Sequence, residues 1–193
     1  TKTIKNFRRI QKQESACIGD IMLDKYIWGD VSRISPEAPV QVVNVVKETY
    51  EPGGASNVTN NVSALGGKAF MVGIVGNDSS KDIILDELKK KSVDVSGIFT
   101  DNDKPTIQKI RIMGRSQQLL RVDYEKKEHV HKDVENSIME FLIKIVKDID
   151  IVVSLDELHK LKQETLSKND NLKKYEIKFD EVDVDIYLEY FSK

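Results

Sequence analysis

Two consecutive glycines begin the segment of this sequence with the clearest capacity for binding chemistry. Gly53 and Gly54 precede Ala55-Ser56-Asn57. Glycine permits tight turns and close approach of the backbone to a ligand, and N–H groups at the start of a following helix bind anionic or hydroxyl-rich groups. Asn57 would add a side-chain amide. The spacing matches neither GxxxxGK(S/T) nor GxGxxG, so a tight turn without a ligand is the alternative interpretation.

Two carboxylates lie shortly before these glycines in the chain. Residues 15–22 predict a buried strand, and Asp20 and Asp24 fall at its expected carboxyl end. Ligands bind at that edge of α/β sheets, where carboxylates accept hydrogen bonds from hydroxyl groups. Solvated loop residues are the other interpretation, and the residues taken alone favour it.

The other reactive side chains do not predict a catalytic or metal-binding set. Only three histidines are present, His129, His131 and His159, and the first two lie in a charged segment where we expect them to be exposed rather than ligands. Cys17 has no evident catalytic partner and is expected to be a small core residue. We therefore assign no catalytic residue and no metal ligand.

Helices and strands alternate along the segments that must position these groups. Ala55, Val58, Val62 and Leu65 recur every three or four residues, which predicts a helix directly after the glycine pair. We expect a second helix to be capped by Ser79 or Ser80. The further expected elements are strands at 68–75, 95–99, 106–113, 117–124 and 151–154 and helices at 79–91 and 132–147. This alternation predicts an α/β fold with a mostly parallel sheet.

One predicted strand differs from the rest. Residues 41–46 place Val42 and Val46 on one face and Val43 and Val45 on the other, so both faces need cover. No helix is expected beside this strand. The pattern favours a β flap that projects from the α/β body and whose second apolar face needs a partner.

Composition excludes several classes of protein. The 193 residues carry 30 basic and 32 acidic side chains, which gives no electrostatic footprint for nucleic acid. No apolar run is long enough for a transmembrane helix. Residues 1–14 lack the apolar core of a secretory signal and instead favour a short amphipathic helix. Together with the single cysteine, this predicts a cytoplasmic protein.

The amino-acid composition of the chain changes after residue 154. Residues 155–193 contain neither glycine nor proline and are rich in charge, although a continuing α/β domain needs turns. We therefore place a boundary here, between an α/β part at 1–154 and a divergent charged segment at 155–193.

Four stretches, taken in order, resemble the ribokinase-like (PfkB) sugar kinases. They are GDIMLDKYIWGDVSRISPEAPVQVV (19–43), PGGASNVTNNVSALGG (52–67), VGIVGND (72–78) and PTIQKIRIMGRSQQLLRVDYE (105–125). The segments SRISPEAPV and QQLLRVD are similar to the branch that phosphorylates D-glycero-β-D-manno-heptose 7-phosphate. The resemblance covers residues 15–154.

This resemblance implies a doubly wound α/β body whose β flap, at about residues 25–48, acts as a lid and as a homodimer clasp. The family transfers the γ-phosphoryl group of ATP, with Mg²⁺, to a sugar hydroxyl, here in ADP-heptose formation for lipopolysaccharide. By the resemblance, Asp24 and Asn57 would hold the sugar, while Gly53 and Gly54 would allow its close approach. Further sugar or phosphate contacts would come from Arg33, Lys109, Arg111, Gln118 and Arg121, although surface ion pairs are the alternative for this last group.

The sequence departs from the family in its second half. The family's Gly-Ala-Gly-Asp motif, which supplies the catalytic base, does not occur, and no glycine follows Gly114. No counterpart of the ATP-binding segments is found either, so we expect the second half of the fold to be missing or replaced. On this basis we expect the chain by itself to bind sugar phosphate with little ATP-dependent turnover. A non-catalytic dimerisation or regulatory module is the alternative.

Overall fold

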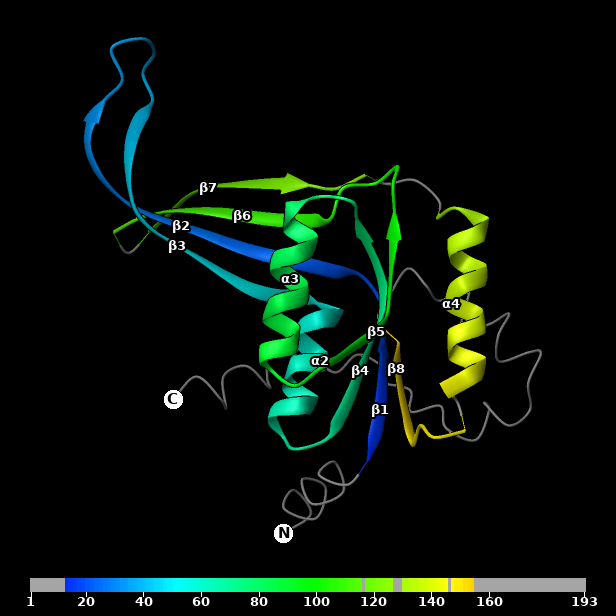
Figure 1. Ribbon diagram of the computed structural model, residues 1–193. Helices are drawn as coiled ribbons and strands as arrows, with labels where there is room; N and C mark the ends of the chain where they lie inside the picture. The colour runs from blue at the N-terminus through cyan, green and yellow to red at the C-terminus, as the bar shows by residue number, and fades with distance from the viewer. Residues whose placement is uncertain (1–12, 116, 127–129, 146, 155–193) are drawn as a thin grey trace.

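The computed structural model describes residues 13–115, 117–126, 130–145 and 147–154 (Figure 1). The helix expected before residue 13 and the segment 155–193 lie outside these residues. The strands are β1 (Glu14–Ile18), β2 (Ile21–Ile34), β3 (Gln41–Gly54), β4 (Lys68–Gly76), β5 (Asp94–Asp101), β6 (Ile107–Gly114), β7 (Gln117–Tyr124) and β8 (Ile151–Ser154). The helices are α2 (Ala55–Ala64), α3 (Ser79–Lys90) and α4 (Lys132–Ile145).

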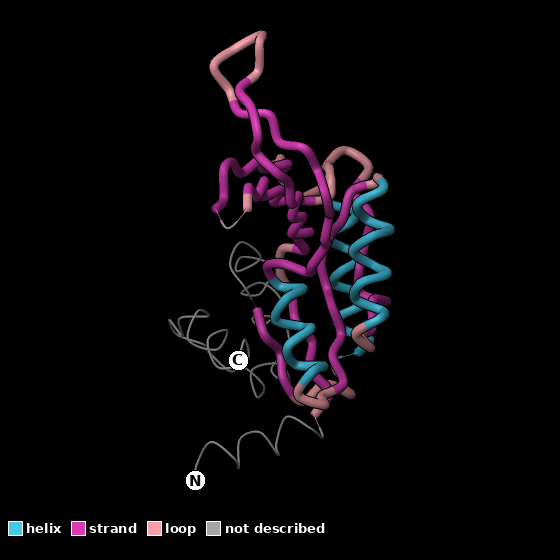
Figure 2. The backbone as a smooth tube through the Cα atoms, turned by 90° about the vertical axis from the view of Figure 1, so that its left-hand side faces the viewer, coloured by secondary structure: helices cyan, strands magenta, loops and turns pink. Residues whose placement is uncertain are grey.

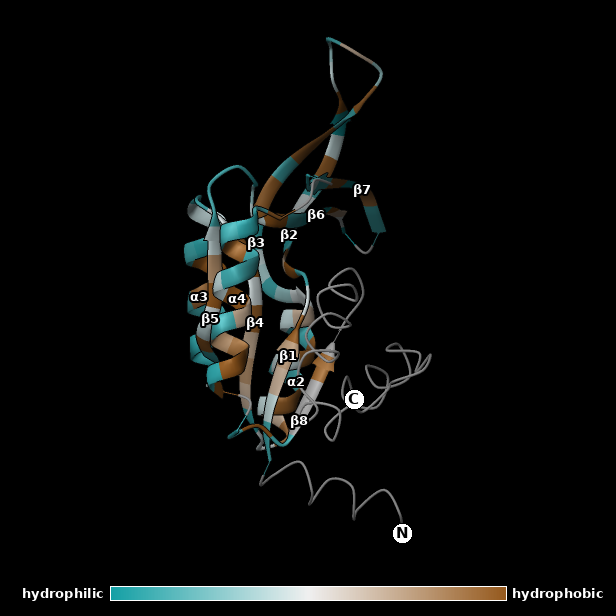
Figure 3. Cartoon of the chain, turned by 90° about the vertical axis from the view of Figure 1, so that its right-hand side faces the viewer, coloured by the Kyte–Doolittle hydropathy of each residue, from teal (hydrophilic) through white to brown (hydrophobic). Residues whose placement is uncertain are grey.

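A parallel sheet in the order β5-β4-β1-β8 forms the body. Because side chains alternate along a strand, β4 serves two hydrophobic clusters. Met71 and Val75 pack with Ile84 of α3, whereas Val72 packs with Ile138 of α4. Helices α2 and α3 therefore cover one face and α4 covers the other (Figure 1), and Figure 3 colours much of β4 between them as hydrophobic. The predicted α/β fold with helices on both faces is confirmed.

A second sheet, in the order β3-β2-β6-β7, forms the flap. Strands β2 and β3 pair antiparallel over almost their whole length, and β2 also pairs parallel with β6. The β2–β3 hairpin extends beyond the body and ends in an exposed loop (Figure 2). Within this sheet the β2–β3 hairpin runs from Ile21 to Gly54, which is longer than the flap expected at about 25–48, because its two strands continue down to the edge of the body.

The buried strand expected at 15–22 is wrong as a single element. The chain leaves the parallel sheet after Ile18 and enters the flap sheet at Ile21. The last parallel hydrogen bond runs from Gly19 N to Val72 O, at 3.2 Å. A Cβ on Gly73 would lie 2.5 Å from the Gly19 carbonyl oxygen, so this crossing requires a glycine on the neighbouring strand. Asp24 consequently lies in the flap sheet and not in the body.

Helix α2 packs through small residues rather than through its predicted apolar stripe. Of that stripe only Ala55 is buried, while Val58 and Val62 are half-buried. The buried positions also include the hydroxyl residues Ser56 and Thr59. Their hydroxyls are satisfied locally, because Ser56 Oγ donates to Gly53 O and Thr59 Oγ1 donates to Ala55 O. Small side chains let the helix approach the sheet closely.

Helix α3 begins with Asp78 as its N-cap, and not with the expected Ser79 or Ser80. Asp78 Oδ1 accepts from Lys81 N at 3.1 Å, as an N-cap carboxylate does. Its Oδ2 accepts from Thr106 N at 2.8 Å, and Thr106 Oγ1 accepts from Gly76 N at 3.0 Å. One carboxylate therefore caps the helix and ties it to the segment that leads into β6. Within the described residues, no helix has the length and apolar character that crossing a membrane requires.

The Asp78 contacts make folding stability depend on pH. Partial burial acts to raise the pKa of Asp78, but the N–H groups of Thr106 and Lys81 outweigh it and lower that pKa below its usual value. A lowered folded-state pKa adds stability above the unfolded-state value of about 3.9. That stability is lost as the pH falls through the lower, folded-state pKa.

We expect Asp78→Ala to lower the free energy of unfolding at pH 7 by about 1–2 kcal/mol, as N-cap losses do, and to weaken the acid dependence. Asp78→Asn should keep much of the cap but lose the acid dependence that Asp78 contributes. Urea denaturation at pH 7 and pH 3 measures both quantities. Asp86→Asn, exposed on α3, is the matched control, and equal losses in Asp86→Asn and Asp78→Ala at pH 7 would contradict the expectation.

Candidate functional site

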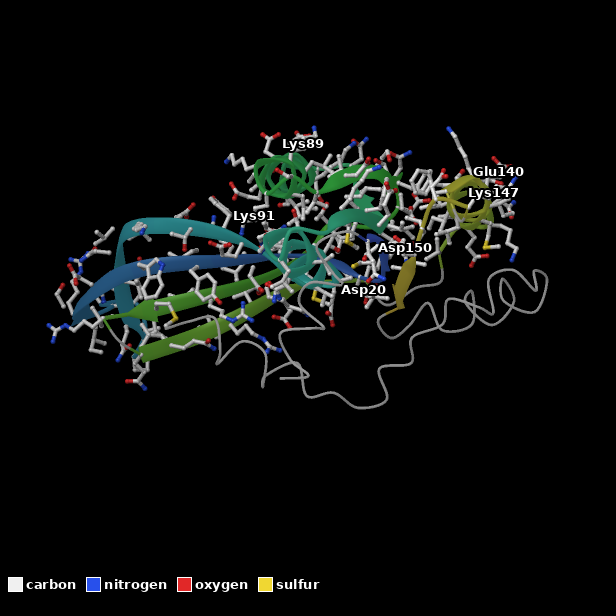
Figure 4. All side chains as sticks on the ribbon, turned by 90° about the horizontal axis from the view of Figure 1, so that it is seen from below. Asp20, Lys89, Lys91, Glu140, Lys147 and Asp150 are labelled. Atoms are coloured by element: carbon white, nitrogen blue, oxygen red, sulfur yellow. The ribbon has the colours of Figure 1, made fainter. Side chains whose placement is uncertain are left out.

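The end of β3 meets the β1–β2 connection at the carboxyl edge of the parallel sheet. Gly54 has φ of 56°, a left-handed conformation that favours glycine. A Cβ there would lie 2.7 Å from the Asp20 carbonyl oxygen, and the same oxygen accepts from Ala55 N at 3.0 Å. Figure 4 shows Asp20 close to α2. The glycine pair therefore forms a tight turn into α2, which both interpretations include, and it also brings two backbones into contact.

Gly53 provides the room in which Asp24 lies. In the β2–β3 register, Met22 is opposite Gly53 and Asp24 is opposite Glu51. A Cβ on Gly53 would lie 2.5 Å from Asp24 Oδ2. Any larger residue at this position would push the carboxylate out of place. The predicted pair of glycine and carboxylate is thus brought together, with Oδ2 directed at the glycine.

The other carboxylate oxygen of Asp24 is held by Arg111 of β6. Arg111 Nη1 donates to Asp24 Oδ1, and the guanidinium carbon lies 5.3 Å from the centre of the Tyr26 ring. Partial burial acts to lower the pKa of Arg111, but the hydrogen bond and charge of Asp24 outweigh it and raise that pKa. The carboxylate is therefore fixed by a permanently charged partner.

Across the sheet from Asp24, Lys109 and Arg121 converge on Asp123. Lys109 Nζ lies 3.1 Å from Asp123 Oδ2, and Arg121 Nε lies 3.0 Å from Asp123 Oδ1. Glu125 also pairs with Lys109. Desolvation acts to lower the pKa of Lys109, but the two carboxylates outweigh it and raise that pKa. Hydrogen bonding to Lys109 in turn lowers the pKa of Asp123. Without a ligand, Lys109 and Arg121 therefore form surface ion pairs, which was the alternative interpretation of these residues.

The strand register aligns these side chains in rows on one face of the flap sheet. Asp24, Lys109 and Asp123 form one row. Tyr26, Arg111 and Arg121 form the next row on that face, because every second residue of a strand shares a face. The first row thus carries two carboxylates with a lysine between them, and the next row carries an aromatic ring and two guanidinium groups.

Two predicted residues lie away from this group. Arg33 is exposed near the tip of the hairpin, opposite Val42, about 30 Å along β2 from Asp24 at the usual rise per residue. Gln118 is exposed on β7 opposite Met113, which is aligned with Trp28 rather than with Asp24. In this arrangement neither side chain is brought to the Asp24 carboxylate.

Asn57 lies in the first turn of α2, near the same edge, and is half-buried. The first turn of α2 contains no acidic residue. The N-terminal end of a helix carries partial positive charge, so this end favours an anion or a hydroxyl oxygen. Among the described residues, the carboxyl edge thus offers a carboxylate, an amide side chain and a helix N-terminus within one neighbourhood.

Tyr26 and Asp123 are contributors that the sequence did not reveal as site residues. Tyr26 lies under Arg111 and stacks on Trp28, with ring centroids 6.0 Å apart. Trp28 Nε1 in turn donates to Thr49 Oγ1 at 3.2 Å. The available signal was the alternation Asp24, Tyr26, Trp28 in a strand, which indicates one shared face. Asp123 could have been noted because it directly follows the basic and apolar run of β7.

The cysteine and the histidine that the structure describes, for which the sequence predicted no catalytic or ligand role, lie away from Asp24. Cys17 is buried in β1, and burial raises the pKa of its thiol to about 11, although a hydrogen bond to Thr59 acts in the opposite direction. A thiol that stays protonated near neutral pH is a poor nucleophile, so its expected place in the core is confirmed. His131 is exposed as expected, and His129 and His159 lie outside the described residues.

Comparison with known proteins identifies the family to which this chain belongs. The pfkB family carbohydrate kinase profile matches residues 12–174. "Bifunctional protein HldE" of Desulfatibacillum aliphaticivorans is 41% identical over 139 residues, which are 72% of this chain and 28% of that protein. The protein of the same name from Geobacter sulfurreducens is 44% identical over 125 residues, or 65% of this chain and 26% of that protein.

Solved structures show the same fold. A putative ribokinase from Agrobacterium tumefaciens aligns with a TM-score of 0.60 and 20% identity, covering 84% of this chain and 50% of that one. A putative sugar kinase from Clostridium perfringens aligns with a TM-score of 0.63 and 15% identity, covering 84% and 48%. This chain therefore spans under a third of the length of the HldE relatives and about half of these kinases.

The contact between Gly53 and Asp24 can be tested with a double-mutant cycle. We expect Gly53→Ala to lower the free energy of unfolding by about 1–3 kcal/mol, the usual cost of overpacking. In an Asp24→Ala background that cost should fall by more than half, since the remaining contact, Met22 Cβ at 3.4 Å, is an ordinary one. Chemical denaturation of the four chains measures the coupling.

Gly54→Ala is the matched control for this cycle. Its Cβ would meet the Asp20 backbone and its φ is positive, so Asp24→Ala should not relieve its cost. Equal costs of Gly53→Ala in both backgrounds would contradict the proposed contact.

Proposed function

Since this chain belongs to the pfkB family of carbohydrate kinases, we propose that its described residues form the sugar-binding and lid part of a kinase. We propose further that the substrate is D-glycero-β-D-manno-heptose 7-phosphate, within ADP-heptose formation for lipopolysaccharide in the cytoplasm. The resemblance of segments SRISPEAPV and QQLLRVD to that branch supports the choice of sugar, and so does the identity to the HldE proteins.

The Asp24 carboxylate beside Gly53 is the observation that carries this proposal. Arg111 holds Oδ1, so Oδ2 keeps a fixed direction toward the side of the strand where the glycine has no side chain. A sugar hydroxyl placed there would donate to Oδ2. A hydrogen bond to a charged acceptor is stronger than one between neutral groups, and a preorganised acceptor loses little entropy on binding.

Neighbouring groups can complete the recognition of a phosphorylated sugar. Asn57 at the start of α2 can donate its amide to a second hydroxyl. Lys109, Arg111 and Arg121 on the same face supply positive charge for a phosphate, and a guanidinium binds a phosphate with two hydrogen bonds. On binding, the phosphate would replace Asp123 as the partner of Lys109 and Arg121.

The described residues fit the sugar and not the nucleotide. ATP with Mg²⁺ would supply the transferred phosphoryl group and the cation that neutralises its charge. In the part of the chain that the structure describes, the carboxylates beside the sugar position, Asp24 and Asp123, are each paired with basic side chains. No residue there is assigned to the nucleotide, so the proposal covers binding and orientation of the sugar.

Binding of heptose 7-phosphate tests this proposal directly. We expect saturable binding to the 193-residue chain and a 10- to 100-fold weaker affinity for Asp24→Asn, because a hydrogen bond to a charged group contributes about 1.5–3 kcal/mol. Isothermal titration calorimetry measures both. Asp82→Asn, exposed on α3, is the control of equal charge change and should bind like the parent chain. Unchanged affinity in Asp24→Asn would contradict the role of Asp24.

The same chain should show little ATP-dependent turnover by itself, because it contains no Gly-Ala-Gly-Asp motif. A coupled assay for ADP formation with heptose 7-phosphate measures this. Robust phosphorylation that Asp24→Ala abolishes would overturn the expectation of low turnover while supporting the sugar site.

A second candidate function is a non-catalytic dimerisation or regulatory module. It is favoured by apolar side chains that are more than half exposed around the end of the flap, Ile34, Val40, Val45 and Val46. Val46 is the most exposed of them, at 72%. Exposed apolar groups gathered in one region favour association, and the two-fold pairing of flaps that the family resemblance implies would cover them.

Replacement of one flap valine separates these possibilities. We expect the parent chain to be a dimer and Val46→Asp to shift it toward monomer by at least tenfold in dissociation constant, since a charge buried in an apolar interface is costly. Light scattering over a concentration series measures the shift. Ile143→Asp, on the exposed side of α4, is the matched control. A parent chain that stays monomeric at every concentration would contradict dimerisation through the flap.

A further inference from the structure

We infer that Asp101, Asp103 and His131 form a binding site for a divalent transition-metal ion that is separate from the sugar site. Asp101 ends β5, Asp103 follows it in the turn, and His131 immediately precedes α4. One oxygen of each carboxylate and one imidazole nitrogen all lie within 4.8 Å of one another. Three ligand atoms therefore converge from two segments that are 28 residues apart in the chain.

Local contacts orient the three side chains. His131 Nε2 lies 2.7 Å from Asp103 Oδ2. The backbone carbonyl of His131 accepts from Val134 N and Glu135 N, both at 3.0 Å, which fixes the residue at the start of α4. Asp101 Oδ1 accepts from Asp103 N at 2.9 Å, so the two aspartates are held in one tight turn.

The Asp101 side chain gives the independent reason to expect a cation. Asp101 is only 2% exposed, and its Oδ2 is buried without any hydrogen-bond partner in the part of the chain that the structure describes. A buried carboxylate oxygen without a partner is costly. A bound cation would satisfy it, whereas the imidazole of His131 is directed to Asp103.

The ligand set selects the class of ion. Mg²⁺ and Ca²⁺ prefer oxygen ligands alone, whereas one imidazole with two carboxylates suits Zn²⁺ and related first-row ions. His131 and Asp103 are exposed, with 58% and 66% of their side chains accessible, so the ion can enter from solvent and keep water in its remaining positions.

The position of the site gives it a structural role. Strand β5 is separated from β1 by β4, which places its end roughly 10 Å from the end of β1 at the usual strand spacing. The site shares no residue with Asp24 and its partners, although Lys126, which follows β7, donates from Nζ to Asp103 O at 3.3 Å. An ion here would fasten the turn after β5 to the start of α4, the helix that packs Phe141 against Phe99 of β5.

Zinc titration of the whole 193-residue chain tests this inference. By isothermal titration calorimetry, we expect the parent chain to bind one more equivalent of Zn²⁺ than His131→Gln or Asp103→Asn. Zn²⁺ should also raise the melting temperature of the parent chain but not of either variant. Both replaced side chains are exposed, so the variants should fold, and circular dichroism confirms that they do.

Two controls keep the outcome decisive. Glu140→Gln, on the outer side of α4 (Figure 4), should bind Zn²⁺ with the same stoichiometry as the parent chain. Excess Mg²⁺ should not compete at this site. Equal stoichiometry and affinity for Zn²⁺ in the parent chain, His131→Gln and Asp103→Asn would overturn the inference, because any bound zinc would then be held by other residues.

Discussion

The close passage of two backbones at the carboxyl edge of the parallel sheet is the constraint on which the rest of this structure depends. The end of β3 passes the β1–β2 connection so closely that Gly54 has no space for a side chain beside the Asp20 carbonyl. Because of this contact, the flap joins the body where α2 begins. The Asp24 carboxylate and the N-terminus of α2 are neighbours for the same reason, and a looser crossing would separate them.

The charged face of the flap sheet is organised around carboxylates rather than around its basic residues. Asp24 forms an ion pair with Arg111, and Asp123 forms ion pairs with both Lys109 and Arg121. Such pairs add little stability at an exposed surface. Their effect is to hold long side chains in definite directions, which would lower the entropy lost if the proposed sugar phosphate bound there.

Hydrophobic periodicity predicted most of the elements in order, but it did not predict β2 as a strand separate from β1. Residue types and spacing identified the glycine pair, Asp24 and Asn57 as candidates, and the resemblance gave them their expected roles. The crossing at Gly19 was missed because apolar residues lie on both sides of Gly19 and Asp20, so the two strands resemble one continuous buried strand. Asp78 was missed as a cap because Asp78, Ser79 and Ser80 are all of types that favour the N-cap position, and its contact with Thr106, 28 residues away, is not visible in the sequence. Likewise, alternation within a strand places Tyr26 on one face with Asp24, but the contacts of Tyr26 and Asp123 with β6 depend on the register between strands, which a single sequence does not specify.

Strand β2 has a mechanical consequence as one continuous element shared by body and flap. Ile21 and Leu23 are fully buried at its base, so this end is clamped. The pairing with β3 shifts register between Trp28 and Gly29, and such bulges bend a strand. The hairpin is therefore fixed at its base and bends most easily near Gly29. From there to Ile34 the arm is about 16 Å long, so a bend of roughly 10° moves the tip by about 3 Å while leaving the Asp24 carboxylate in place.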